Sequence, residues 1–175
     1  MKFLSIDEQE FQKRLGRIRL LLLDVDGVLT DGTIFHVPGQ GWTRSYNIYD
    51  GYGIKLLQKA GIPVGIISGG ASEELKERIR YLGIRFAVLG SEDKLASLRQ
   101  LSAETGILPE SICFMGDELF DMPALKEAGL AITVPDAMPE VFGIAHAVTS
   151  RAGGKGAVRE VIDRILSARS GAAQG

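Results

Sequence analysis

The chain is organised around the sequence Leu20-Leu21-Leu22-Leu23-Asp24-Val25-Asp26-Gly27-Val28-Leu29-Thr30-Asp31-Gly32. Its leucine run is too short to span a membrane and predicts a strand buried on both faces, in the middle of a parallel sheet. Asp24 and Asp26 follow at the carboxyl end of that strand, where open α/β sheets bind ligands. Two carboxylates this close repel each other, so a site that keeps both needs a cation or must hold one protonated. Taken alone, the motif could also be an ordinary turn.

The composition is that of an ordinary globular protein. The chain has 175 residues, 45% of them hydrophobic, and a formal net charge of -2, which predicts one domain with a substantial core. The basic residues are scattered and balanced by acids, so no nucleic-acid partner is expected. No membrane partner or signal peptide is expected either. The single cysteine, Cys113, cannot form an internal disulfide and indicates a core position in a protein of the reducing cytoplasm.

Alternating strand and helix patterns predict an α/β fold with a doubly wound, mostly parallel sheet and helices on both faces. We expect an amphipathic helical extension over residues 1–17, a single domain over 18–169 and a disordered tail over 170–175. Strands are expected at 18–23, 62–67, 84–89, 111–115, 130–134 and 145–149, the last at the sheet edge. Helices are expected at about 50–60, capped by Asp50, and at about 71–82, 93–105 and 157–169.

A β-hairpin is predicted directly after the acidic motif. Residues 33–37 and 42–48 have strand character, and Pro38-Gly39-Gln40-Gly41 is a turn sequence between them. The hairpin strands carry more apolar and aromatic surface than an isolated hairpin could cover, which predicts a second chain against it. The side chains concerned are Ile34, Phe35, Val37, Trp42, Tyr46 and Ile48.

Polar residues follow three further predicted strands. Ser68-Gly69-Gly70 offers a hydroxyl and flexible backbone amides, which suit an anion. Lys94 lies in the first turn of a helix, where the helix dipole opposes it unless an anion is held nearby. A second acidic cluster, with Asp117, Glu118 and Asp121, follows the strand at 111–115. Because the carboxyl ends of parallel strands share one edge, we expect these groups to meet there.

These motifs resemble the haloacid dehalogenase superfamily of phosphotransferases over residues 18–166. More narrowly, the acidic motif, the stretch Asn47-Ile48-Tyr49-Asp50-Gly51-Tyr52-Gly53-Ile54 and the stretch from Arg151 to Glu160 resemble its capless subgroup, typified by the 3-deoxy-D-manno-octulosonate 8-phosphate phosphatases. The resemblance implies a Rossmann-like fold without a cap domain and a cytoplasmic homotetramer. It also implies an Mg²⁺-dependent phosphomonoesterase acting on a phosphorylated sugar acid, with a 9-phosphate nonulosonate as the alternative to the octulosonate.

The resemblance also assigns roles to the site residues. Asp24 would be the nucleophile that attacks phosphorus, and Asp26 the general acid and base. Asp24, the Asp26 carbonyl and Asp117 would hold Mg²⁺, with Asp121 supporting that shell. Ser68 and Lys94 would hold the phosphoryl oxygens as further catalytic residues. The substrate contacts implied in the same way are Asn47, Asp50, Gly51, Lys55, Gly69 and Arg78.

Three positions depart from the pattern of the subgroup. Glu118 replaces a common aspartate, and Tyr49 stands where an arginine is usual. Gly70 stands where the octulosonate phosphatases carry an arginine and the nonulosonate phosphatases a glutamate. We expect these changes to leave catalysis intact and to alter sugar recognition. Lys55 and Arg78 could meet a sugar-acid carboxylate or be ordinary exposed helix cations.

Two other classes of function fit part of the pattern. A phosphoacceptor receiver domain also combines a doubly wound sheet with an aspartate, a hydroxyl and a lysine, but it carries its acceptor on an interior strand with the acidic pair upstream. Here Asp24 follows the first strand, which disfavours a receiver. A non-catalytic interaction protein is disfavoured because the expected acids and Lys94 are all retained.

Overall fold

The computed structural model describes residues 1–39 and 41–172 and contains a seven-stranded sheet. Every neighbouring pair in it is parallel except the outermost pair, β1 with β9. From one edge to the other, the order is β1 (Lys2–Phe3), β9 (Ala147–Val148), β8 (Leu130–Thr133), β7 (Ile112–Met115), β2 (Leu20–Leu23), β5 (Val64–Ser68) and β6 (Phe86–Leu89).

The central strand is β2, and all of its leucines are buried, as predicted for a strand covered on both faces. The chain leaves β2 for β5 and β6 on one side and then fills the other side with β7, β8 and β9. The carboxyl end of β2 is therefore the point where the strand order reverses. In open α/β sheets this switch point forms the ligand-binding crevice.

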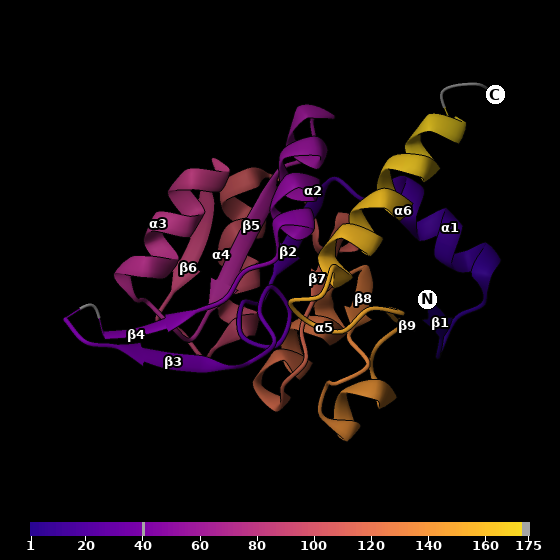
Figure 1. The fold of residues 1–175 in the computed structure, drawn as a ribbon. Helices are drawn as coiled ribbons and strands as arrows, with labels where there is room; N and C mark the ends of the chain where they lie inside the picture. The colour runs from indigo at the N-terminus through magenta and orange to yellow at the C-terminus, as the bar shows by residue number, and fades with distance from the viewer. Residues whose placement is uncertain (40, 173–175) are drawn as a thin grey trace.

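Helices cover the sheet on both faces (Figure 1). Helix α6 packs on α1 and α2, and α4 packs on α5. The helices are α1 (Glu8–Arg17), α2 (Ile48–Lys59), α3 (Glu73–Leu82), α4 (Lys94–Thr105), α5 (Met122–Glu127) and α6 (Ala157–Ala172). This is the doubly wound, Rossmann-like fold that the sequence predicted. None of the helices in the described residues is long and apolar enough to cross a membrane.

The predicted hairpin is present as a separate two-stranded sheet, β3 (Ile34–Val37) with β4 (Gly41–Arg44), which extends away from the main sheet (Figure 1). Gln40 of the predicted turn lies outside the described residues. Strand β4 ends at Arg44 rather than at residue 48, because Asn47 caps helix α2 and its side chain accepts a hydrogen bond from the Tyr49 amide at 2.8 Å.

The prediction that Asp50 caps helix α2 is wrong. Asp50 lies buried in the first turn of α2, and its carboxylate accepts hydrogen bonds from the amides of Gly156, at 3.2 Å, and Arg159, at 2.7 Å. These amides are at the start of α6, where the helix dipole favours a negative charge. Asp50 therefore caps a helix more than a hundred residues away.

The chain ends differ from the prediction in two places. Helix α1 forms where the amphipathic pattern predicted, but Lys2–Phe3 adds the antiparallel strand β1 beside β9. Strand β9 is therefore not at the sheet edge. The Phe3 and Phe11 rings lie 5.1 Å apart, which ties the new edge strand to α1. Helix α6 continues through Ala172, so residues 170–172 are helical rather than disordered; residues 173–175 lie outside the described part of the chain.

Candidate active site

The carboxyl end of β2 holds a buried ion pair. Lys94 Nζ donates hydrogen bonds to Asp24 Oδ1 at 2.5 Å and to the Ile67 carbonyl at 2.9 Å, and it lies 3.1 Å from Asp121 Oδ1. The Lys94 side chain is fully buried. A lysine in a first helical turn opposes the helix dipole, and here two carboxylates compensate for it. The sequence pattern predicts an anion beside Lys94 to offset the helix dipole, and the Asp24 carboxylate is one such anion.

Three aspartates gather around this lysine. Oxygen atoms of Asp24, Asp117 and Asp121 lie within 4.8 Å of one another. Asp121 Oδ2 accepts hydrogen bonds from the amides of Asp117, at 3.0 Å, and Glu118, at 3.1 Å, which fixes the turn that carries the cluster. Burial and the repulsion between these carboxylates raise the pKa of Asp24, and they raise the pKa of Asp117 to about 8.

The cluster has the donor set of a divalent cation site. Of the three acids, Asp24 and Asp121 pair with the ammonium group of Lys94, whereas Asp117 Oδ1 is buried with no hydrogen-bond partner among the described residues. A buried oxygen without a partner is costly unless a ligand satisfies it. Mg²⁺ prefers hard oxygen ligands and often uses one or two carboxylates with water. The residues present therefore fit Mg²⁺.

Glycines bring the surrounding loops close to this cluster. Gly27 has a φ of +87°, and a Cβ there would lie 2.8 Å from Asp117 Oδ1, inside van der Waals contact. The loop 151–156 packs on the acidic motif: the Gly154 amide donates to the Val28 carbonyl at 3.0 Å, and Lys155 pairs with Asp31 at 3.0 Å. The glycines in this loop permit backbone to approach backbone.

The Asp26 side chain does not join the acidic cluster. Its two oxygens accept hydrogen bonds from Arg44, at the end of β4: Nε to Oδ1 at 2.5 Å and Nη2 to Oδ2 at 2.9 Å. Sequence reasoning missed Arg44, because no spacing or periodicity links residue 44 to residue 26. The position of the hairpin relative to the sheet brings the two together.

Ser68 and Gly69 lie where the sequence placed them, at the carboxyl end of β5 beside β2. The Ser68 hydroxyl is buried and accepts a hydrogen bond from the Gly70 amide at 3.1 Å, while Gly69 is exposed. A hydroxyl and adjacent backbone amides at this edge can donate to an anion.

Gly51, Lys55 and Arg78 come together in a groove on the surface of α2 and α3. They line a pocket of about 140 Å³, and Arg78 also lines an adjoining pocket of about 270 Å³ with Arg44 and Tyr46. We call these two pockets together the Arg78 groove. Lys55 Nζ lies 4.1 Å from the centre of the Tyr81 ring. The groove therefore runs from Lys55 past Arg78 to Arg44, which binds Asp26.

The other two predicted substrate contacts bond to the backbone. Asn47 Nδ2 donates to the Gly154 carbonyl at 3.2 Å, and Asp50 binds the amides at the start of α6. Tyr49, which stands where an arginine was expected, is exposed. Asn47 and Asp50 therefore connect α2 with the loop 151–156 that covers the acidic motif.

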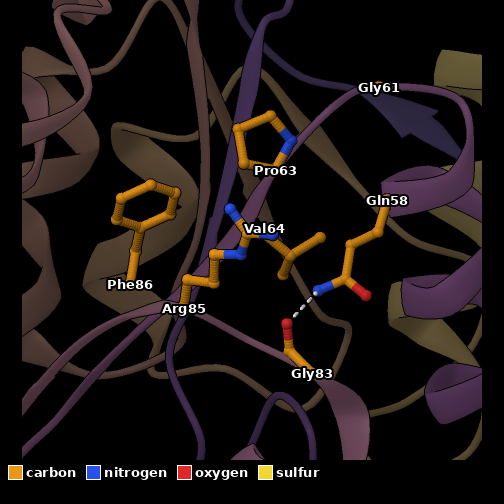
Figure 2. Close-up of a pocket in the computed structure, with 7 residues that line it drawn as sticks. All are labelled: Gln58, Gly61, Pro63, Val64, Gly83, Arg85 and Phe86. Carbon is orange, nitrogen blue, oxygen red and sulfur yellow. Dashed lines mark hydrogen bonds between the residues drawn. The ribbon is translucent and has the colours of Figure 1, made fainter.

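A further pocket, of about 310 Å³, lies at the opposite edge of the sheet (Figure 2). Pro63, Val64 and Phe86 at the amino ends of β5 and β6 line it, and Gln58 donates a hydrogen bond to the Gly83 carbonyl across it at 3.2 Å. The strands separate this hollow from the aspartate cluster, so it is not part of the candidate active site.

Comparisons with known proteins indicate the same chemistry. The model of the haloacid dehalogenase-like hydrolase family matches residues 48–129. The 3-deoxy-D-manno-octulosonate 8-phosphate phosphatases of Yersinia pestis and Escherichia coli K12 are each 41% identical to this chain; the matches cover 90% and 87% of it, and 84% and 81% of the relatives.

Solved structures agree with these sequence matches. The phosphatase of that name from Moraxella catarrhalis, in complex with magnesium, phosphate and KDO, has a TM-score of 0.90 at 34% identity, covering 96% of this chain and 97% of that one. The cobalt-bound phosphatase from Haemophilus influenzae has a TM-score of 0.86 at 39% identity, with coverages of 90% and 92%.

The fold, the aspartate cluster and these comparisons define a haloacid dehalogenase-like hydrolase with Mg²⁺ as its cofactor. Within that class, the chain belongs to the 3-deoxy-D-manno-octulosonate 8-phosphate phosphatase family. The receiver-domain and non-catalytic alternatives are therefore set aside.

Proposed function

We propose that this protein hydrolyses 3-deoxy-D-manno-octulosonate 8-phosphate to the free sugar acid and phosphate, with Asp24 as the nucleophile. The observation that carries the proposal is the position of Asp24: it is buried at the switch point of the sheet, hydrogen-bonded to Lys94, and it lies in one cluster with Asp121 and with Asp117, whose buried Oδ1 has no hydrogen-bond partner among the described residues. Relatives with this fold are named for that reaction.

The reaction would proceed in two displacements. An Asp24 oxygen forms a bond to phosphorus as the bond from phosphorus to the sugar oxygen breaks, and Asp26 gives that oxygen a proton. Asp26 then takes a proton from a water molecule, whose oxygen bonds to phosphorus as the Asp24–phosphorus bond breaks. Asp24 and Asp26 return to their initial states, and phosphate leaves.

Other residues of the chain would hold the phosphoryl group and the metal. Lys94 and the Ser68 hydroxyl, with the Gly69 amide, donate to the phosphoryl oxygens as negative charge develops on them. Asp24, Asp117 and the Asp26 carbonyl would hold Mg²⁺, and Asp121 would keep Asp117 in place through the hydrogen bond it accepts from the Asp117 amide. When bound, Mg²⁺ supplies positive charge that offsets repulsion between the phosphate and the carboxylates.

The Arg78 groove is where we place the sugar acid. Lys55 and Arg78 offer positive charge for a carboxylate, and the groove adjoins Arg44 beside Asp26. Gly51 leaves room for Arg78, because a Cβ at position 51 would lie 2.6 Å from Arg78 Nη2. Asn47 and Asp50 would support substrate binding through the loop 151–156. A 9-phosphate nonulosonate is the second candidate substrate, since Gly70 lacks the arginine expected of an octulosonate phosphatase.

We also propose a homotetramer built through the hairpin. Ile34 and Trp42, which share one face of the hairpin, are 51% and 62% exposed in the single chain, and Phe35 on the other face is 47% exposed, so both faces present large apolar side chains. A neighbouring chain over them would also cover the site mouth and exclude water in place of a cap domain. We place the enzyme in the cytoplasm, where the buried thiol of Cys113 would stay reduced.

Phosphate release from a set of purified phosphate esters tests the proposal. With Mg²⁺, the octulosonate 8-phosphate should give a higher kcat/KM than the nonulosonate 9-phosphate or p-nitrophenyl phosphate, and EDTA should stop the reaction. The D24N variant, correctly folded by its melting curve, controls for contaminating phosphatases. A higher kcat/KM for the nonulosonate 9-phosphate would overturn the proposed substrate but leave the proposed mechanism standing. No Mg²⁺-dependent phosphate release from any ester would overturn both the substrate and the mechanism.

A further inference from the structure

The contact between Arg44 and Asp26 joins the hairpin to the catalytic centre. The guanidinium donates two parallel hydrogen bonds to the carboxylate, at 2.5 and 2.9 Å. A bidentate pair of this kind fixes the plane of the carboxylate as well as its position. The Arg44 side chain is 11% exposed and the Asp26 side chain is 42% exposed, so the guanidinium is the more buried partner and the carboxylate stays accessible.

Arg44 is held in place independently of Asp26. Its Nη1 donates to the Ser72 hydroxyl at 3.1 Å and to Glu74 Oε2 at 3.3 Å, and both residues belong to the start of helix α3. The guanidinium is therefore anchored to the hairpin through its own backbone and to α3 through its other donors. Asp26, on the loop after β2, is the partner whose orientation depends on the contact.

Gly70 provides the space that Arg44 occupies. A Cβ on Gly70 would lie 2.8 Å from Arg44 Nη2 and 3.5 Å from the Ser68 hydroxyl. The φ of Gly70 is outside the left-handed region, so the backbone at this position does not itself require glycine. A Cβ at position 70 would therefore crowd the Arg44 guanidinium in its present position, and the guanidinium would have to shift.

We propose that Arg44 is a positioning residue that orients the Asp26 carboxylate for proton transfer, and that position 70 is glycine because it accommodates the Arg44 guanidinium. This inference rests on the proposed function, since it concerns the acid and base of that reaction. It also gives the hairpin a part in catalysis within its own chain. Arg44 acts through Asp26 and takes no proton itself.

The way the reaction rate depends on the leaving group distinguishes a positioning role of Arg44 from a purely structural one. A sugar alkoxide needs a proton from Asp26 to depart, whereas p-nitrophenolate is stable enough to leave without one. Hydrolysis of the phosphorylated Asp24 needs Asp26 as base for either substrate. In R44A we expect the pre-steady-state burst of p-nitrophenol to keep its rate within roughly threefold, and steady-state turnover of both substrates to fall roughly tenfold or more.

Two variants serve as controls in this experiment. R44K keeps the charge but cannot make a bidentate pair, and it should recover only part of the loss. Arg99 forms an exposed ion pair with Glu127 at 3.2 Å and makes no hydrogen bond or ion pair with the aspartates or with Lys94 among the described residues, so R99A should leave the burst and the steady-state rate unchanged. Equal loss of burst rate and steady-state rate in R44A, or no loss in either, would overturn the positioning role.

A double-mutant cycle tests the pairing of positions 44 and 70. G70A should push the guanidinium away from Asp26 and slow steady-state turnover in the wild-type background, but have no further effect in R44A. If the two losses simply multiply in G70A/R44A, the steric link is wrong. Melting curves must show that all variants fold. If the wild-type protein had no phosphatase activity, the proposed function would be refuted. A failure of the proposed function can therefore be told apart from a failure of the inference about Arg44.

Discussion

Lys94 Nζ lies 2.5 Å from Asp24 Oδ1, so that a fully buried ammonium group links the first turn of α4 to the end of β2. The same nitrogen lies 3.1 Å from Asp121 Oδ1 and therefore also holds the turn after β7. Removing one member of a buried ion pair leaves the other without compensation, which costs far more than losing a surface pair. The integrity of the site depends on this single cation.

Replacing Lys94 with methionine should therefore affect both activity and stability. We expect kcat to fall roughly a hundredfold or more, because a donor to the phosphoryl oxygens is lost. Unfolding by urea in EDTA should show a loss of about 3 kcal/mol, since the carboxylates keep no counter-charge. K126M, at an exposed lysine of α5, is the matched control. Wild-type kcat in K94M would show that Lys94 does not contact the reacting phosphate.

Removal of Mg²⁺ should make stability depend on pH in a definite direction. Burial, and then the charge of Asp24, raise the pKa of Asp117 from 3.8 to about 8. The metal-free folded protein keeps a proton that the unfolded chain releases at lower pH. This contribution to stability is complete below the unfolded pKa and is lost as the pH rises through the folded pKa.

Melting temperatures in EDTA should accordingly fall between about pH 4 and pH 8, and Mg²⁺ should raise them most at the alkaline end, where no proton has to be displaced. The D117N variant should lose the part of this pH dependence that Asp117 contributes and keep the part from Asp24, whose pKa burial and Asp121 also raise. A Mg²⁺-induced shift of the same size at every pH would mean that the aspartates are already ionised without metal.

The sequence predicted the parts of this site that follow from strand order. Asp24, Ser68, Lys94 and Asp117 each lie at or just after the carboxyl end of a buried strand, or at the start of the next helix. Parallel strand packing is enough to bring them together. The pairing of Arg44 with Asp26 could not be predicted in this way, because it depends on how the separate hairpin sits against the sheet.

Local helix rules also misled the interpretation in one respect. Aspartate is favoured at helix caps, so the sequence predicts that Asp50 caps its own helix. Asn47 takes that role, and the Asp50 carboxylate crosses to the start of α6. Sequence periodicity carries no information about such long-range caps. Strand β1 was missed for a similar reason, since two residues are too few to show an alternating pattern.

Substitution of Asp50 tests whether its role is structural or substrate-binding. D50A should lower the free energy of unfolding by about 2 kcal/mol, because two amides at the start of α6 lose a charged acceptor. We expect the loop 151–156 to loosen and kcat to fall with it. D163A, which removes only an exposed i,i+4 pair with Arg159, is the control. A raised KM with unchanged stability would instead indicate direct substrate contact.

The hairpin surface should determine the oligomeric state. Light scattering should give the mass of four chains for the wild type, and a double substitution of Phe35 and Trp42 by glutamate should dissociate it, because charges cannot be buried there without partners. The variant should lose activity as well. A monomeric wild type would refute the homotetramer, and a dissociated variant with full activity would refute the claim that assembly completes the site.

Chemical trapping of the phosphorylated enzyme tests the central claim most directly. Acid quenching during steady-state turnover of the octulosonate 8-phosphate, followed by borohydride reduction, converts a phosphorylated aspartate to homoserine, which peptide mass spectrometry locates. We predict homoserine at position 24, dependent on substrate and Mg²⁺ and absent from D24N. Active turnover with an unmodified residue 24, or with homoserine at another aspartate, would contradict the assignment of Asp24 as the nucleophile.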